Sequence, residues 1–93
     1  MKITVPLEHR DGKIDFFEVD ASCPFEMFGF QFAAHRRLGD HKTDEWVCVE
    51  ISSGAIVRHG DTRTQAIRSA KELIEAAGAD RVKKKVNEQL KRQ

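Results

Sequence analysis

Apolar and polar residues alternate along several short segments in the first 60 residues, and the spacing then changes to that of a helix. Alternation with a period of two is typical of half-buried strands. It predicts four strands over residues 3–7, 14–16, 28–34 and 46–51, and a fifth that ends at His59. The segment 21–27 contains Pro24 and is predicted to be a loop, and residues 38–45 form a polar connection.

Two short turn sequences set the expected strand register. Asp11-Gly12 predicts a two-residue hairpin loop that pairs Leu7 with Phe16. Ser52-Ser53-Gly54 predicts a three-residue loop, with Val57 opposite Val49 on the preceding strand. Each register brings two apolar side chains to one face, as a half-buried hairpin requires.

A helix is predicted over residues 62–77. Thr62 and Gln65 have the spacing of a capping box, and Gly78 stands where a glycine commonly ends a helix. Its apolar stripe consists of Ala66, Ile67, Ala70, Leu73, Ile74 and Ala77. In the tail, Val82, Val86 and Leu90 are four residues apart, which fits either a second helix or a continuation of the first.

These elements predict an α+β fold, in which a C-terminal helix packs on one face of an antiparallel sheet of three to five strands, with a basic helical tail. Residues 1–80 would form a single α+β domain, and residues 81–93 a basic tail that is helical or frayed. The expected core consists of Val5, Leu7, Phe16, Phe28, Phe30, Phe32, Val47, Val49, Ile51, Val57, Ile67, Ala70, Leu73 and Ile74.

The charge is unevenly distributed along the 93 residues. Residues 1–80 hold ten Lys and Arg against 14 Asp and Glu, a net charge of −4, whereas residues 81–93 hold six against one, a net charge of +5. No apolar run approaches the roughly 20 residues that span a bilayer. Two cysteines without a partner motif and no evident targeting segment favour free thiols and a cytoplasmic location.

The sequence contains no catalytic signature, no metal-ligand spacing and no phosphate-binding loop. His35, His41 and His59 are scattered, whereas zinc needs three or four ligands around one ion. The prediction is therefore a protein that is not an enzyme and holds neither a metal nor another cofactor.

Trp46 suggests a protein-binding surface. Strand alternation places it opposite Val47 and Val49, on the sheet face that the helix would leave open, and exposed tryptophans often anchor interfaces. The predicted protein-binding residues on this face are Trp46, Gln31, His35 and Glu50. The alternative is that the N-terminal hairpin or the tail helix folds over this face.

Basic residues offer a second hypothesis, that of a nucleic-acid-binding module. The candidates that could contact phosphates are Arg36, Arg37, Arg58, Lys83, Lys84, Lys85, Lys91 and Arg92. The net charge of −4 over residues 1–80 favours a protein partner over nucleic acid. The sequence predicts no particular oligomeric state.

Residues 46–76 resemble the N-terminal domain of HicB-type antitoxins. The matching residues are Trp46, Val47, Val49, Gly54, Val57, Gly60, Asp61, Thr62, Ala66, Ala70, Glu72 and Ile74. The resemblance implies a strand–turn–strand–helix fold and an antitoxin-like protein that binds a partner protein. In architecture the prediction is also similar to plant ethylene-response-factor domains and phage integrase arm-binding domains, which implies the nucleic-acid alternative. The small size of the chain would suit a phage or mobile-element gene.

Overall fold

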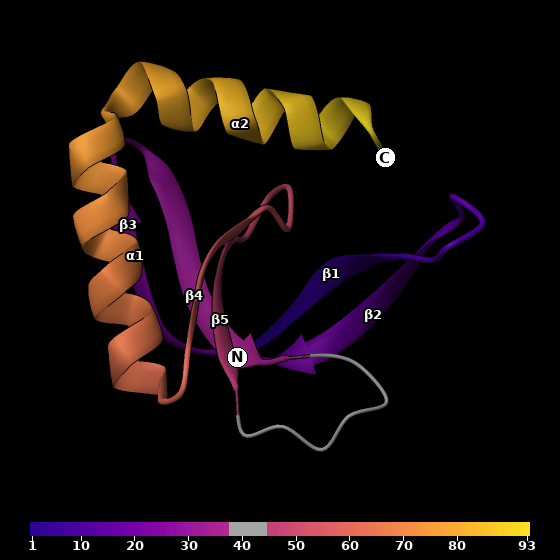
Figure 1. Ribbon diagram of the computed structural model, residues 1–93, viewed down its shortest axis with the longest axis horizontal. Coiled ribbons are helices and arrows are strands. Elements are labelled where there is room, and N and C mark those ends of the chain that lie inside the picture. Colours follow the sequence, from indigo (N-terminus) through magenta and orange to yellow (C-terminus); the bar gives the residue numbers. More distant parts are fainter. Residues whose placement is uncertain (38–44) are drawn as a thin grey trace.

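A computed structural model describes residues 1–37 and 45–93 (Figure 1). It contains two antiparallel sheets and two C-terminal helices, which confirms the predicted α+β class. The predicted polar connection over residues 38–45 lies, apart from Glu45, outside the described residues.

Within residues 1–37 and 45–93, the elements follow one another as six strands and then two helices. Their bounds are β1 Lys2–Glu8, β2 Ile14–Asp20, β3 Ser22–Met27, β4 Phe30–Arg36, β5 Trp46–Glu50, β6 Ile56–Gly60, α1 Arg63–Ala77 and α2 Ala79–Lys91. Strands β3 to β6 form a four-stranded sheet in chain order, while β1 and β2 form a separate two-stranded sheet.

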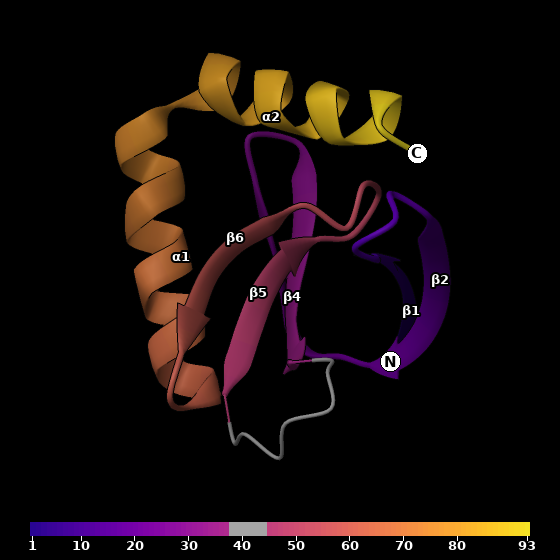
Figure 2. The same ribbon diagram turned by 45° about the vertical axis from the view of Figure 1, so that its right-hand side comes forward.

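The four-stranded sheet lies between α1 on one face and the β1–β2 hairpin on the other (Figure 2). Helix α1 therefore packs on one face, as predicted. The opposite face is covered in part by the N-terminal hairpin, the alternative that the sequence left open. Helix α2 runs across the end of the sheet, and its last residue lies near the tip of the hairpin (Figure 1).

Residues 22–27 form strand β3, so the predicted loop is wrong. Pro24 is tolerated because β3 is an edge strand and its pairing with β4 is irregular between Ser22 and Phe25, where Pro24 lies. The chain then turns through Phe28 and Gly29, both at positive φ (54° and 81°), as in the tight turns that match strand twist. Phe28 is therefore in a turn and 47% exposed, and the prediction that it is a core strand residue is wrong.

The first hairpin is shifted by one residue from the predicted register. Leu7 pairs with Asp15, and Phe16 pairs with Pro6. The turn is longer than expected, since the His9 N–H donates to the Lys13 carbonyl oxygen (2.8 Å). A one-residue shift turns each side chain to the other face, so Phe16 is 55% exposed and does not join the core as predicted.

The second hairpin also differs from its prediction. A hydrogen bond of 2.9 Å from the Glu50 N–H to the Ala55 carbonyl oxygen encloses a longer loop than expected. Val49 pairs with Ile56, and the register then shifts so that Cys48 pairs with Arg58. This irregularity displaces Val57 from its predicted position opposite Val49 and lets it pack on the helix side.

Helix α1 has the predicted ends. The Thr62 side chain accepts a hydrogen bond from the Gln65 N–H (3.1 Å), and Gly78 adopts a φ of 83° while its N–H donates to the Ile74 carbonyl oxygen (3.0 Å). Leu73 is 40% exposed, so its assignment to the core is wrong. The break at Gly78 separates α1 from α2, which resolves the question of whether the tail continues the first helix.

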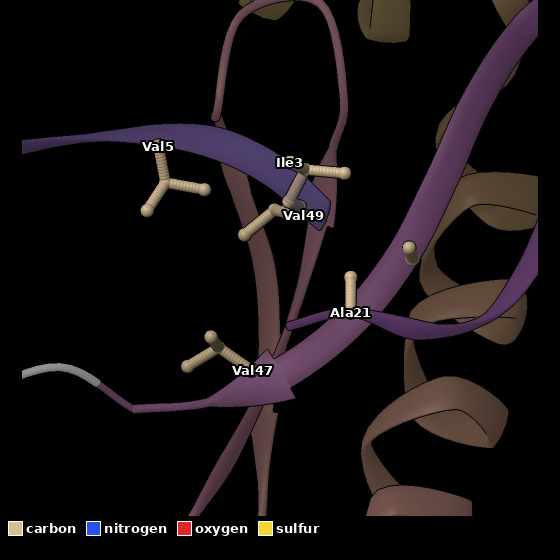
Figure 3. Close-up of a cluster of buried hydrophobic side chains, with 6 residues drawn as sticks. Ile3, Val5, Ala21, Val47 and Val49 are labelled. Atoms are coloured by element: carbon tan, nitrogen blue, oxygen red, sulfur yellow. The ribbon is translucent and has the colours of Figure 1, made fainter. Parts of the chain in front are cut away.

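Two clusters of buried side chains lie on opposite faces of the four-stranded sheet. Phe32 and Cys48 pack with α1 on one face, in a cluster completed by Ala70 and Ile74. Val47 and Val49 face the hairpin instead, where they gather with Ile3, Val5 and Ala21 (Figure 3). The prediction that Val47 and Val49 face the helix is therefore wrong. This central strand is apolar on both faces, so its alternation does not show which face meets the helix.

Candidate functional site

A cleft of about 210 Å³ opens between the β1–β2 hairpin and the sheet face that α1 leaves free. Apolar residues make up most of its wall, and three basic or imidazole side chains complete it. The lining consists of Val5, Pro6, Leu7, Val47, Val49, Gly54 and Ile56 together with His35, Arg37 and His59. The cleft is smaller than the roughly 300–1,000 Å³ of most small-molecule sites.

The hairpin is held over the sheet by contacts at its base. Val5 is buried against the β5 valines, and the ring of Pro6 lies so close to Gly54 that a Cβ at this position would collide with it. Gly54 also has a φ of 71°, which favours glycine. Farther along, Leu7 is only half-buried and Ile56 is 58% exposed, so this wall of the cleft is open to an incoming group.

His35 forms part of the wall of the cleft and is 4% exposed. Its Nδ1 lies 2.6 Å from the carbonyl oxygen of Arg36, which can only accept, so Nδ1 carries the proton and donates. Burial lowers the pKa of His35, and the ring is therefore neutral near pH 7. Within the described part of the chain Nε2 has no hydrogen-bond partner, which leaves it as an acceptor for a molecule in the cleft.

Glu45 links the two other polar residues of the cleft. Its Oε2 accepts a hydrogen bond from Arg37 Nη1 at 2.8 Å, and its Oε1 lies 3.3 Å from His59 Nδ1. His59 and His35 flank Val47 from the two neighbouring strands. The apolar wall is thus bordered by a polar end, which is formed by His35 on β4, by Arg37 directly after β4 and by His59 on β6.

Trp46 does not lie on the face predicted for it. It shares its face of β5 with Cys48, on the helix side, and is half-buried. The Arg36 Cζ lies 5.3 Å and the Arg63 Cζ 5.7 Å from the centre of its ring, within cation–π range. The predicted helix-free position of Trp46 is wrong, because β5 presents its valines to the hairpin.

The other predicted protein-binding residues are also separated from Trp46. Gln31 and His35 lie on the hairpin side of β4, because their positions alternate with that of Phe32 in the helix-side cluster. Glu50 is 2% exposed, and its carboxylate accepts four hydrogen bonds of 2.6–2.9 Å from Ser52 and Ser53. Glu50 thus holds the β5–β6 loop and is buried, not part of an exposed surface.

The predicted nucleic-acid-binding residues divide into two groups. Arg36 and Arg58 belong to the sheet and Arg37 directly follows β4. Arg36 contacts Trp46, and Arg37 pairs with Glu45. The others are on α2, which crosses the opposite end of the sheet from the start of β5 (Figure 2). These are Lys83, Lys84, Lys85 and Lys91, followed by Arg92, whose side chain bonds to Glu8 at 2.8 Å.

Asp80 and Glu88 lie beside the exposed lysines of α2, so the outer face of this helix carries both signs of charge. In residues 1–37 and 45–93 no group of three His, Cys, Asp or Glu side chains could hold a metal ion. Cys23 is an exposed free thiol, and burial raises the pKa of the free Cys48 thiol to about 12. Neither helix in the described part of the chain has the length and apolar character that crossing a membrane requires.

Sequence reasoning predicted His35 and Arg37 as candidate residues but missed the cleft that contains both. One signal was present: β5 reads Trp-Val-Cys-Val-Glu, an almost unbroken apolar strand of the kind that is buried on both faces. Such a strand implies that a second element covers the sheet on the face opposite the helix. No family model, curated protein or solved structure matches the chain.

Proposed function

We propose that this protein is a non-enzymatic binding protein and that its cleft receives an apolar side chain from a segment of a partner protein. The single observation that carries the proposal is an open cleft of about 210 Å³ with an apolar wall and a polar end. Such a volume suits one large side chain better than a cofactor or a drug-sized ligand. Aromatic and aliphatic anchors that fill a pocket contribute most to the affinity of protein interfaces.

The polar end supports a peptide as the ligand. Neutral His35 offers Nε2 as a hydrogen-bond acceptor. A peptide can supply the donor, because every residue except proline has a backbone N–H that could reach Nε2 beside the buried anchor. The lining, as far as the structure describes it, contains neither a carboxylate nor a hydroxyl or thiol nucleophile. This composition favours binding over covalent catalysis, which needs such a nucleophile.

The resemblance of residues 46–76 to HicB N-terminal domains agrees with a protein partner of the antitoxin kind. The nucleic-acid alternative finds less support, because the basic candidates lie at two ends of the sheet and Arg37 and Arg92 are engaged in ion pairs. A dedicated phosphate-binding surface gathers its Lys and Arg side chains on one face.

The test is a selection of binding peptides from a random library, followed by titration with NMR of the valine methyl groups. We expect selected peptides to share an apolar anchor and to shift the signals of Val5, Val47 and Val49. Ile56→Glu, which places a charge at the opening, should weaken binding at least tenfold. Leu90→Glu makes the same change at an exposed residue of α2 and should leave the affinity unchanged.

Peptides whose binding shifts only α2 signals, or whose affinity does not change with Ile56→Glu, would contradict the cleft as the site. A parallel titration with mixed DNA tests the alternative. Affinity that falls steeply with salt and disappears without residues 81–93 would favour a nucleic-acid partner instead.

A further inference from the structure

The outer edge of β2 pairs with no strand within residues 1–37 and 45–93. Along its inner edge β2 pairs with β1 from Ile14 to Asp20 without a bulge. The hairpin extends away from the four-stranded sheet (Figure 1), so this outer edge faces outward. Unpaired N–H and C=O groups along such an edge form a template for another strand.

In the described part of the chain, the other three sheet edges carry features that disfavour strand addition. Pro6 lies in β1 against Gly54, Pro24 lies in β3 together with a register irregularity, and β6 is interrupted by a register shift opposite Cys48 and Val49. Proline and bulges are two of the devices by which native edge strands avoid pairing. β2, with the sequence Ile-Asp-Phe-Phe-Glu-Val-Asp, has neither.

The β1–β2 ladder shows which groups face this edge. The Ala21 N–H donates to the Met1 carbonyl oxygen (2.7 Å) and the Met1 ammonium donates to the Ala21 carbonyl oxygen (3.0 Å), so these two residues form a hydrogen-bonded pair. Bonded pairs alternate along antiparallel strands, and Pro6, which has no N–H, falls at an unbonded position opposite Phe16. The backbone groups that face outward are therefore those of Ile14, Phe16, Glu18 and Asp20.

We propose that this edge binds β2 of a second copy of the chain, antiparallel, with the two-fold axis at Phe17. In this register all of β2 pairs, and the outward-facing residues meet one another, as backbone hydrogen bonding requires. No acidic residue faces another acidic residue directly. Asp15 lies opposite Val19, Glu18 opposite Phe16, and Asp20 opposite Ile14 of the second copy.

Side-chain exposure supports a second copy as the occupant. Phe16 is 55% exposed and Phe17 41% exposed, although strands bury aromatic residues well. The two-fold axis pairs Phe17 with its own equivalent, an aromatic cross-strand pair. The two-stranded sheet also becomes four-stranded, and three or more strands are what a small sheet needs for independent stability.

Sedimentation equilibrium over a concentration series tests the proposal with the full chain. We expect a monomer–dimer equilibrium whose dissociation constant rises at least tenfold in Phe16→Pro, which removes an outward N–H and leaves the β1–β2 hydrogen bonds in place. Phe16→Ala keeps the N–H and is the control for the lost side chain, so it should dimerise more tightly than Phe16→Pro. Circular dichroism checks that each variant is folded.

Cysteine cross-linking tests the register itself, in a Cys23→Ser background. In an unbonded antiparallel pair the Cα atoms lie about 4.5 Å apart, within the range of a disulfide. Phe17→Cys should therefore form a disulfide-linked dimer under mild oxidation, and Phe16→Cys far less, because its equivalent is not its direct neighbour. A monomer at every concentration would overturn the proposal. So would a dimer that Phe16→Pro leaves unchanged, or equal cross-linking at both positions.

Discussion

The two faces of the four-stranded sheet are covered in different ways. On one face α1 covers large side chains, with Phe32 only 1% exposed and its ring stacked on Phe25 at 5.2 Å between centroids. On the other face the hairpin covers small aliphatic residues and leaves a cleft with His35 in its wall. A well-filled face serves stability, whereas an incompletely covered face offers a place for a ligand.

Chain connectivity explains this difference. Helix α1 follows β6 almost directly, and Gly60 lies so close to the Ala66 backbone that a Cβ would collide with it. The hairpin reaches its face from the other end of the chain and extends beyond the sheet, with its tip bonded to α2 through Glu8 and Arg92. Because the β1–β2 hairpin extends beyond the four-stranded sheet, it does not fill all the space between itself and the sheet.

Truncation of one core residue on each face gives the largest expected effect. Phe32→Ala should lower the free energy of unfolding by about 3–5 kcal/mol, because the helix-side cluster is closely packed around this ring. Ile3→Ala on the hairpin side should cost about 2 kcal/mol, since the hairpin can shift toward the space that is left. Urea denaturation measures both values, and equal losses would show that the two faces are equally well packed.

The loop beside the cleft should respond to loss of its buried carboxylate. Glu50→Ala leaves the N–H and hydroxyl groups of Ser52 and Ser53 without their acceptor and should cost about 2–3 kcal/mol. Glu45→Ala is the matched control, because its partners are about half exposed, and it should cost less than about 1 kcal/mol. Thermal or urea unfolding measures the free energy of unfolding of both variants. Equal losses in Glu50→Ala and Glu45→Ala would contradict the expected difference.

The smallest effect concerns pH. Burial lowers the pKa of folded His35 below its ordinary value of 6.5, so the unfolded chain binds this proton more readily than the folded one. The contribution of neutral His35 to the free energy of unfolding is thus fully present above pH 6.5. It is lost as the pH falls below 6.5, and the free energy of unfolding drops by no more than about 1.4 kcal/mol per pH unit. Urea unfolding from pH 8 to pH 5 should therefore be less pH-dependent in His35→Gln than in the wild type, and an unchanged pH dependence would contradict this expectation.

The sequence by itself determined the elements whose signals are local. Thr62, Gln65 and Gly78 act through the backbone within four residues, and α1 begins and ends where they predicted. The strand alternation around Phe32 and Val49 likewise identified β4 and β5 and the α+β class. Hydrogen bonds and side-chain periodicity within one element depend little on the rest of the chain, which is why these predictions were correct.

Only the tertiary structure decided which faces meet. A one-residue change in the first turn exposed Phe16, and the β4–β5 pairing put Trp46 with α1 and His35 with the hairpin. Both faces of β5 are apolar, so no alternation within it distinguishes the helix side from the hairpin side. The cleft depends on how two segments some 40 residues apart pack together, and its residues were therefore predicted singly and not as one site.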